Sequence, residues 1–192
     1  MTSPAAAFRR VLEVFNHLAI PYMVGGSLAT SVHGIPRSTN DIDLVAEVRL
    51  DHIPTLSAEL GTEFYADLEM MKQALRTGRM FNLIHYESSY KFDIYPVRQQ
   101  PYYQAAFDRR KLDQYSFEGR EVVPFYVESP EDAILAKMVW YRAGDEISER
   151  QWSDILDVIR VQQDRLDLAY LRHWAPSLKV ADLLERAILT QS

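Results

Sequence analysis

The sequence of 192 residues contains no cysteine. Disulfide bonds, thiolate catalysis and cysteine-ligated zinc sites are therefore excluded, and nothing indicates a redox compartment. Glycine (7) and proline (9) are scarce, which excludes a collagen-like or linker-rich chain. Hydrophobic residues make up 47% and charged residues 25%, as in ordinary globular proteins. The length suffices for one domain with a true core, alone or with a helical appendage.

An excess of positive charge is also absent. The formal net charge of −6 excludes binding of nucleic acid by bulk charge, although a local basic groove stays open. Residues 1–12 lack the apolar segment and cleavage-like tripeptide of a signal peptide. The uncharged stretch 16–36 is interrupted by prolines, glycines and a histidine, so it is too broken for a transmembrane helix. We therefore expect a cytoplasmic protein without membrane contact.

Hydrophobic periodicity predicts an α+β fold. Strands are expected over residues 21–24, 41–48, 80–86, 90–97 and 121–127, with residues 87–89 closing a hairpin. Helices are expected over residues 4–19, 28–34, 51–60, 65–77, 101–110, 129–143, 148–163 and 166–188, the last with a break near residue 176. We predict a small mixed, twisted sheet flanked by helices over residues 1–128, and a helical lobe over residues 129–192 that completes a cleft.

A Gly-Gly-Ser turn, Gly25-Gly26-Ser27, ends the first expected strand and opens a helix. Such a turn presents backbone N–H groups and a hydroxyl at a helix N-terminus, which is an arrangement that binds phosphate. Glycine is needed there because a side chain would block the approach of the phosphate. Alone, however, such a sequence is usually only a turn, so its function depends on what accompanies it.

Three acidic residues accompany it. Asp41 and Asp43 lie two apart on one expected strand, so they share a face about 6.6 Å apart. Two such carboxylates repel each other unless a cation is present, and two Mg²⁺ ions about 3.5–4 Å apart would fit them and hold a triphosphate. If the strand 90–97 pairs beside this one, Asp93 lies about 4.8 Å away and could bind metal or accept a proton. Lys91 shares that face and could neutralise phosphate.

The order of these motifs is informative. A Gly-Gly-Ser turn, a spacer of thirteen residues, Asp-Ile-Asp-Leu and a later hydrophobic-Asp-hydrophobic strand resemble the nucleotidyltransferases of the DNA polymerase β superfamily. The sequence motif Arg-Ser-Thr-Asn-Asp-Ile-Asp-Leu-Val resembles that of small bacterial AbiEii-type proteins, many of which are toxin–antitoxin components. The strong match covers residues 22–47 and 90–97, and the helical third resembles these families more loosely.

The resemblance implies roles for the matching residues. Gly26 and Ser27 would hold the β and γ phosphates. Asp41, Asp43 and Asp93 would be catalytic and would bind two Mg²⁺ ions. The other residues expected to contact the nucleotide are Gly25, Arg37, Thr39, Lys91, Lys137 and Asp154. Of these, Lys137 and Asp154 rest on loose spacing in the helical third.

Several of these residues also have purely structural explanations. Arg37 could pair with Asp41 or Asp43, and Asp93 could be a structural acid. Lys137 and Asp154 could form salt bridges instead of contacting a ligand. The five histidines form no zinc-binding pattern, so a zinc site is not expected.

The combination predicts a Mg²⁺-dependent nucleotidyltransferase of EC 2.7.7 type, which moves an NMP from an NTP such as ATP to a hydroxyl. The resemblance implies a tRNA 3′ end or a protein as acceptor, and a cognate toxin or antitoxin as partner. The negative net charge slightly disfavours tight tRNA binding. One alternative acceptor is a small molecule of the aminoglycoside kind. Another alternative is a catalytically silent nucleotide-binding regulatory or antitoxin module.

Overall fold

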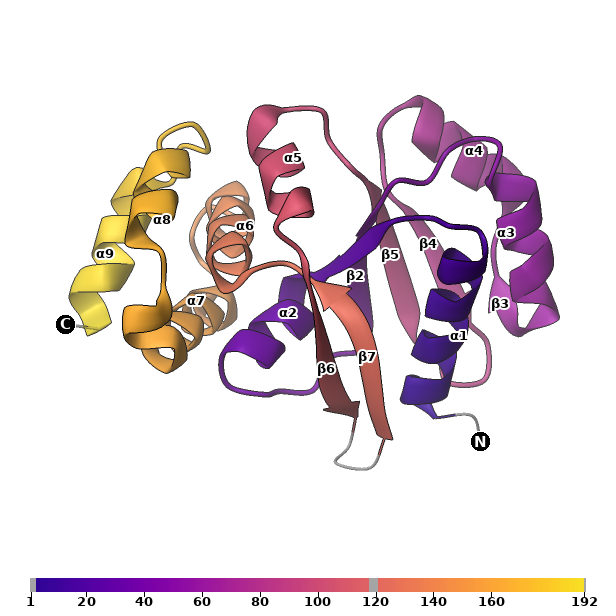
Figure 1. Ribbon diagram of the computed structural model, residues 1–192, viewed down its shortest axis with the longest axis horizontal. Coiled ribbons are helices and arrows are strands. Elements are labelled where there is room, and N and C mark those ends of the chain that lie inside the picture. Colours follow the sequence, from indigo (N-terminus) through magenta and orange to yellow (C-terminus); the bar gives the residue numbers. More distant parts are fainter. Residues whose placement is uncertain (1–2, 118–120, 192) are drawn as a thin grey trace. The chain divides into compact units, whose positions relative to one another are not determined.

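A computed structural model describes residues 3–117 and 121–191 (Figure 1). Contacts within the chain divide it into two units. Unit 1 comprises Met1–Val24 and Thr39–Val127, and unit 2 comprises Gly25–Ser38 and Glu128–Ser192. Residues 25–38 therefore belong with the C-terminal helices, whereas the sequence suggested a single division at residue 128. The function of these two regions as a catalytic core and a completing lobe stays a prediction.

Unit 1 is built on a seven-stranded sheet with the order β3-β4-β5-β2-β1-β7-β6. The strands are β1 (Tyr22–Gly25), β2 (Asp41–Ala46), β3 (Phe64–Tyr65), β4 (Phe81–His85), β5 (Lys91–Pro96), β6 (Lys111–Phe117) and β7 (Glu121–Val127). The sheet is mixed: β2 pairs parallel with β5 and β1 with β7, whereas the pairs β3·β4, β4·β5 and β6·β7 are antiparallel.

The sheet of unit 1 is accompanied by helices α1 (Pro4–His17), α3 (Ile53–Leu60), α4 (Leu68–Arg76) and α5 (Pro101–Asp108), and by the 3₁₀ turn η1 (Gly61–Glu63). Helix α1 packs on β7 and α3, and α4 packs on β4. The Phe8 ring of α1 lies 5.3 Å from Phe125 and 6.3 Å from Phe92, centroid to centroid. Large buried aromatic rings thus join α1 to strands on both sides of β2 and give unit 1 its core.

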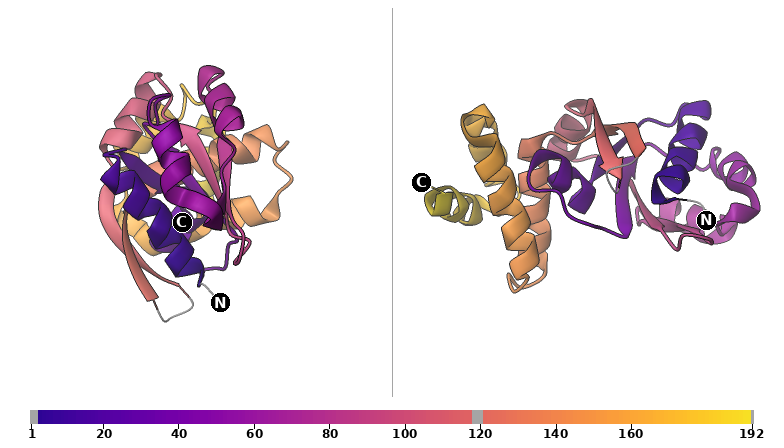
Figure 2. Two further views of the ribbon diagram at one scale, coloured as in Figure 1. Left: turned by 90° about the vertical axis from the view of Figure 1, so that its right-hand side faces the viewer. Right: turned by 90° about the horizontal axis from the view of Figure 1, so that it is seen from below.

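Unit 2 is helical. It contains α2 (Gly26–His33), α6 (Pro130–Ala143), α7 (Glu149–Gln162), the 3₁₀ turn η2 (Gln163–Arg165), α8 (Leu168–Trp174) and α9 (Ala181–Gln191), seen from further sides in Figure 2. Helix α2 packs against both α6 and α7. At its end, a Cβ on Gly34 would lie 3.0 Å from the backbone nitrogen of Val158. Glycine is therefore required for this close approach of α2 to α7.

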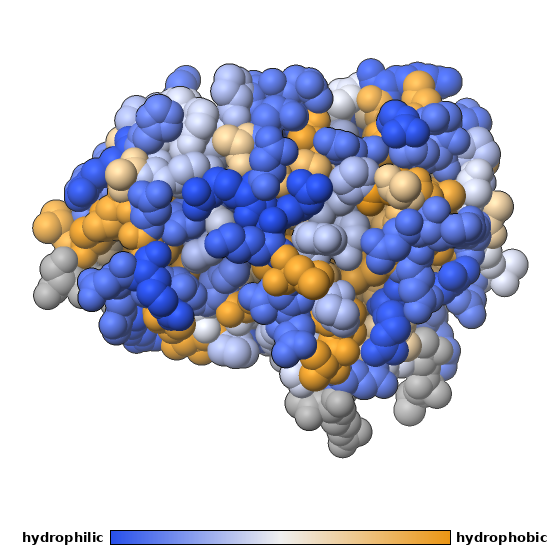
Figure 3. Space-filling view, viewed as in Figure 1, coloured by the Kyte–Doolittle hydropathy of each residue, from blue (hydrophilic) through white to orange (hydrophobic). Residues whose placement is uncertain are grey.

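The α+β class and most predicted elements are confirmed. Ser129 caps α6 by accepting a hydrogen bond from the backbone N–H of Asp132, as its sequence indicates. Strands β3 and β6 were not predicted, because β3 has two residues and β6 is almost wholly exposed. Among the described residues, no helix combines the length and the apolarity that crossing a bilayer requires. Hydrophilic residues cover most of the face drawn in Figure 3, with apolar residues in separate patches.

Candidate functional site

The three candidate metal-binding aspartates of unit 1 lie on two adjacent parallel strands. Asp43 on β2 is directly opposite Asp93 on β5, and Asp41 is opposite Lys91. Ile42, the residue between the two β2 aspartates, is fully buried. Because side chains alternate along a strand, burial of Ile42 places Asp41 and Asp43 together on the other face. The expected pairing of the two acidic strands is thus present.

Lys91 is placed among these carboxylates. Its ammonium lies 3.0 Å from Oδ2 of Asp93 and 3.7 Å from Oδ1 of Asp41. The hydrogen bond to Asp93, reinforced by the charges of the aspartates, raises the pKa of Lys91. On its other side Asp93 accepts a hydrogen bond from the side-chain amide of Asn82, which is its partner on β4. Asp93 is 7% exposed. Its contacts with Lys91 on β5 and Asn82 on β4 hold its carboxylate in position.

Tyr95 is a further member of this surface that the sequence reasoning missed. Burial, followed by the negative charges of Asp43 and Asp93, raises its pKa to about 12. Its hydroxyl is consequently protonated at neutral pH. Its position two residues after Asp93 on the same strand was the signal that could have identified it.

Thr39 fixes the backbone at the start of β2. Its hydroxyl donates to the carbonyl oxygen of Asp41 at 3.0 Å, and its own carbonyl oxygen accepts from the hydroxyl of Tyr90 at 2.9 Å. In this structure Thr39 therefore orders the segment that carries Asp41, and its expected contact with a nucleotide stays a prediction.

Across residues 3–117 and 121–191, no three histidine, cysteine, aspartate or glutamate side chains are arranged so that they could hold a metal ion as they stand. In unit 1 the ammonium of Lys91 already contacts two of the three predicted ligands. Metal binding by Asp41, Asp43 and Asp93 consequently stays a prediction.

The Gly-Gly-Ser turn begins unit 2. Gly26 has φ of +61°, which is the left-handed region, and it opens α2 directly after β1. A Cβ on Gly25 would lie 3.4 Å from a carboxylate oxygen of Glu128, which is an ordinary van der Waals contact. Of the two glycines, Gly26 thus has a backbone reason, and the contact of both with phosphate stays a prediction.

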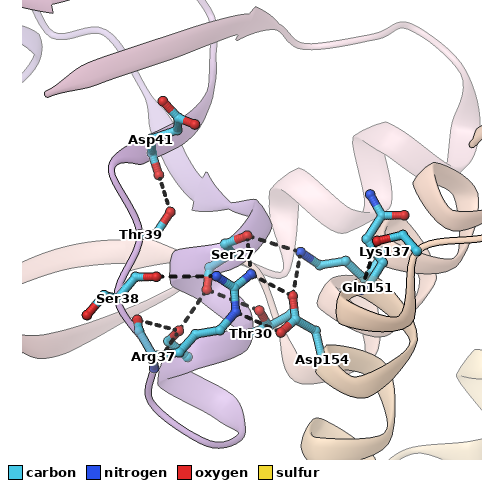
Figure 4. Close-up of polar contacts among 11 residues, drawn as sticks. Ser27, Thr30, Arg37, Ser38, Thr39, Asp41, Lys137, Gln151 and Asp154 are labelled. Carbon is cyan, nitrogen blue, oxygen red and sulfur yellow. Dashed lines mark hydrogen bonds and ion pairs between the residues drawn. The ribbon is translucent and has the colours of Figure 1, made fainter.

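The other predicted residues of unit 2 form one polar network around Ser27 (Figure 4). Arg37 binds Asp154 in a bidentate manner, with both N···O distances 2.8 Å, and donates to the Ser27 hydroxyl at 2.7 Å. Lys137 lies 3.1 Å from Asp154 and donates to the same hydroxyl at 3.3 Å. The structure thus brings together four residues that the sequence listed separately, including two from its loosest match.

This network is partly buried, and its four side chains include two cations and one carboxylate. The side chains of Lys137 and Asp154 are each 8% exposed. Burial by itself raises the pKa of Asp154, but the hydrogen bonds and charges of Arg37 and Lys137 outweigh it and lower that pKa. Asp154 is therefore ionised at neutral pH, and two cations surround one carboxylate and one hydroxyl. Such an arrangement suits a negatively charged ligand.

Neither a scan of protein-family models nor a search of curated proteins finds a match. Solved structures do match. The solution structure of the antibiotic-resistance factor ANT(2″)-Ia has a TM-score of 0.52 at 16% identity, covering 97% of this chain and 94% of that one. The crystal structure of ANT(2″)-Ia in complex with adenylyl-2″-tobramycin has a TM-score of 0.55 at 14% identity, with 91% and 96% covered.

The chain has a nucleotidyltransferase-like fold. The predicted fold is therefore confirmed at the level of architecture. The finer resemblance to AbiEii-type proteins is not tested by these structures and stays a prediction. At such low identity the similarity shows the fold alone, so any activity must be argued from the residues of this chain.

Proposed function

We propose that this protein is a Mg²⁺-dependent nucleotidyltransferase that moves an NMP from an NTP to a hydroxyl group of a small molecule. The observation that carries the proposal is the pairing of Asp43 with Asp93, beside Asp41, within this fold. Three carboxylates gathered on one sheet face repel each other, which favours the binding of a cation there. Lys91 is an ion-pair partner of Asp41 and Asp93.

The donor atoms of unit 1 suit magnesium in their chemistry, although the structure, over the residues that it describes, does not arrange them around a metal position. Carboxylate oxygens are the protein ligands that this ion prefers, and Asp43 and Asp93 face each other across paired strands. Asp41, Asp43 and Asp93 would hold the metal, and Lys91 would then be free to contact phosphate. Bound there, Mg²⁺ supplies charge stabilisation to a transferring phosphoryl group.

We infer that the charged groups of unit 2 suit the phosphates of a nucleotide. Arg37 and Lys137 would exchange part of their pairing with Asp154 for phosphate oxygens. The hydroxyl of Ser27 and the backbone of Gly26 would donate to the same phosphates. Asp154 keeps both cations in place when no nucleotide is bound.

The reaction follows from these groups. The acceptor oxygen attacks the α-phosphorus and forms a new O–P bond. The bond from that phosphorus to the bridging oxygen breaks, and pyrophosphate leaves with the electron pair. The proton of the attacking hydroxyl passes to the carboxylate of Asp93 on β5. We call the sheet face that carries Asp41, Asp43 and Asp93 the acidic face. Tyr95, whose hydroxyl stays protonated, would donate a hydrogen bond at that face.

Two observations favour a small-molecule acceptor. One of the similar structures is named for its adenylylated aminoglycoside, adenylyl-2″-tobramycin. The net charge of −6 also opposes the approach of a polyanion. The alternative, a tRNA or protein acceptor with a cognate toxin or antitoxin, is supported by the sequence resemblance alone.

The test is incubation with Mg²⁺, each α-labelled NTP and either a small-molecule panel or total tRNA with cell lysate. Small products are resolved by thin-layer chromatography and macromolecules on gels. We expect label in a small molecule, and a loss of about 10³-fold in Asp43→Asn, which removes one negative charge without changing shape. The matched control is Asp113→Asn, an exposed carboxylate on β6 of the same unit.

Each other outcome has a distinct meaning. Label in tRNA that falls steeply with salt would replace the small molecule by RNA as acceptor. Label in a protein band would indicate a protein acceptor. Mg²⁺-dependent NTP binding without transfer would indicate the silent regulatory module. Normal turnover by Asp43→Asn would refute the assignment of the site.

A further inference from the structure

Unit 1 contains a cavity of about 220 Å³ between α4 and the start of β4. Its lining includes Tyr65, Met70, Met71, Ala74, Met80 and Asn82. The volume corresponds to about seven water molecules in the liquid. It is below the usual range for whole drug-sized ligands, so it suits a single ring or one ring of a larger molecule.

The lining of this cavity is chemically uneven. Three methionines provide a polarisable apolar surface that adapts to a flat ring. Two apolar groups of the lining are exposed, Met70 at 59% and Tyr65 at 37%, and the Tyr65 hydroxyl donates to the Met70 sulfur. Exposed apolar side chains gathered around a cavity are typical of a ligand site.

The charged groups of the lining oppose a polycationic ligand. Asp67 already accepts the backbone N–H of Met70 as the N-cap of α4. Arg79 supplies a positive charge in the same lining. The cavity therefore lacks the excess of carboxylates that an aminoglycoside would require.

One residue connects the cavity with the acidic face. Asn82 lines the cavity, and its amide donates to Asp93, the carboxylate to which the proposed function assigns the proton. A ring bound on the methionines would share the cavity with Asn82, which follows Met80 and Phe81 in the lining. A ring hydroxyl that lies beside Asn82 is then near the group that would accept its proton.

We propose that this cavity is the acceptor site and that the acceptor is a neutral ring compound with one apolar face and a hydroxyl group. This inference rests on the proposed function for the transfer step, but the binding of such a ring is independent of that function. The proposed acceptor is neutral and has an apolar face, whereas tobramycin is a sugar with several amino groups.

The test uses 4-hydroxybenzyl alcohol as the probe and tobramycin as the contrasting ligand. Ala74→Phe fills the cavity from α4, whereas Arg76→Phe adds the same ring to an exposed position of α4 outside the lining. By saturation-transfer NMR we expect the probe to bind the wild type and Arg76→Phe, and to bind Ala74→Phe at least tenfold more weakly. Thr77→Phe, at an exposed position of the lining, repeats the test if Ala74→Phe unfolds at a lower temperature.

Kinetics separate this inference from the proposed function. With ATP and Mg²⁺, Ala74→Phe should raise the KM for the probe at least tenfold and leave the KM for ATP within about twofold. Binding of the probe without any transfer would refute the proposed function and leave the ring site standing. Transfer to the probe that neither cavity variant weakens, absence of probe binding, or tighter binding of tobramycin would each overturn the inference.

Discussion

Each of the two units contains a cluster of charged side chains, and the two clusters have net charges of opposite sign. In unit 1 three carboxylates share a partly exposed sheet face with the ammonium of Lys91. In unit 2 the cations of Arg37 and Lys137 pair with the buried carboxylate of Asp154. Excess negative charge attracts a cation and excess positive charge attracts an anion, so the two clusters suit ligands of opposite charge. Each cluster lies within one unit, so each can be altered separately.

The largest effect on stability is expected from Asp154→Asn. This substitution removes the charge that pairs with Arg37 and with the buried ammonium of Lys137, which destabilises the folded protein by about 3 kcal/mol. Urea unfolding measures the loss. The control is Asp157→Asn on the same helix, which removes a more exposed pair with Arg160 and should change stability by no more than about 0.5 kcal/mol. Equal losses would contradict the contrast between the clusters.

The pH dependence of that loss follows from the lowered pKa of Asp154. A carboxyl group with a depressed pKa in the folded state stabilises it fully above its unfolded pKa of about 3.9, and the contribution disappears as the pH falls through the folded pKa. The difference between wild type and Asp154→Asn should therefore be constant from pH 5 to 7 and shrink below about pH 4. A difference that grows towards acid would show that Asp154 does not bind the cations as an anion.

A smaller effect is expected when the cation of unit 1 is removed. Lys91→Met leaves the carboxylates without their ammonium, so Mn²⁺ without nucleotide should bind about fivefold more tightly, equivalent to ~1 kcal/mol. Titration calorimetry measures this affinity, with Lys111→Met, an exposed lysine of β6, as the control. Weaker Mn²⁺ binding would mean that Lys91 organises the aspartates instead of competing with a metal.

The smallest effect concerns Tyr95. Asp43→Asn removes one of the charges that raise the pKa of Tyr95, so this pKa should fall from about 12 towards its ordinary value. Tyrosine labelled with ¹³C at the ζ carbon reports the titration by NMR, and Tyr95→Phe assigns the signal. An unchanged pKa would show that burial alone sets it.

Local features of the sequence predicted most of the elements. The alternation of aspartates with Ile42 and Leu44 fixed the face of β2, because a slip of one residue would bury charge. Strand β6 escaped prediction because its residues show no apolar alternation. Strand β6 is formed by its pairing with β7, and no local pattern in Lys111–Phe117 predicts that pairing.

Pairings between distant residues were the harder part. A hairpin centred on residue 88 places Leu83 opposite Asp93, but the actual turn places Asn82 there, so one residue decides which side chain supports the carboxylate. Arg37 and Asp154 are 117 residues apart, and periodicity carries no information about their contact. The resemblance to a known superfamily named both residues but not their bond.

The chain passes between the two units after residues 24, 38 and 127. During synthesis, most strands of unit 1 emerge within residues 41–127, close in sequence to the strands that they pair with. Helix α2, in contrast, emerges about 100 residues before its partners α6 and α7. Until those helices leave the ribosome, the buried side of α2 is unprotected and Arg37 lacks its carboxylate. Unit 2 can therefore fold only late in translation, and a chain released at residue 127 would expose an incomplete segment that chaperones and proteases recognise.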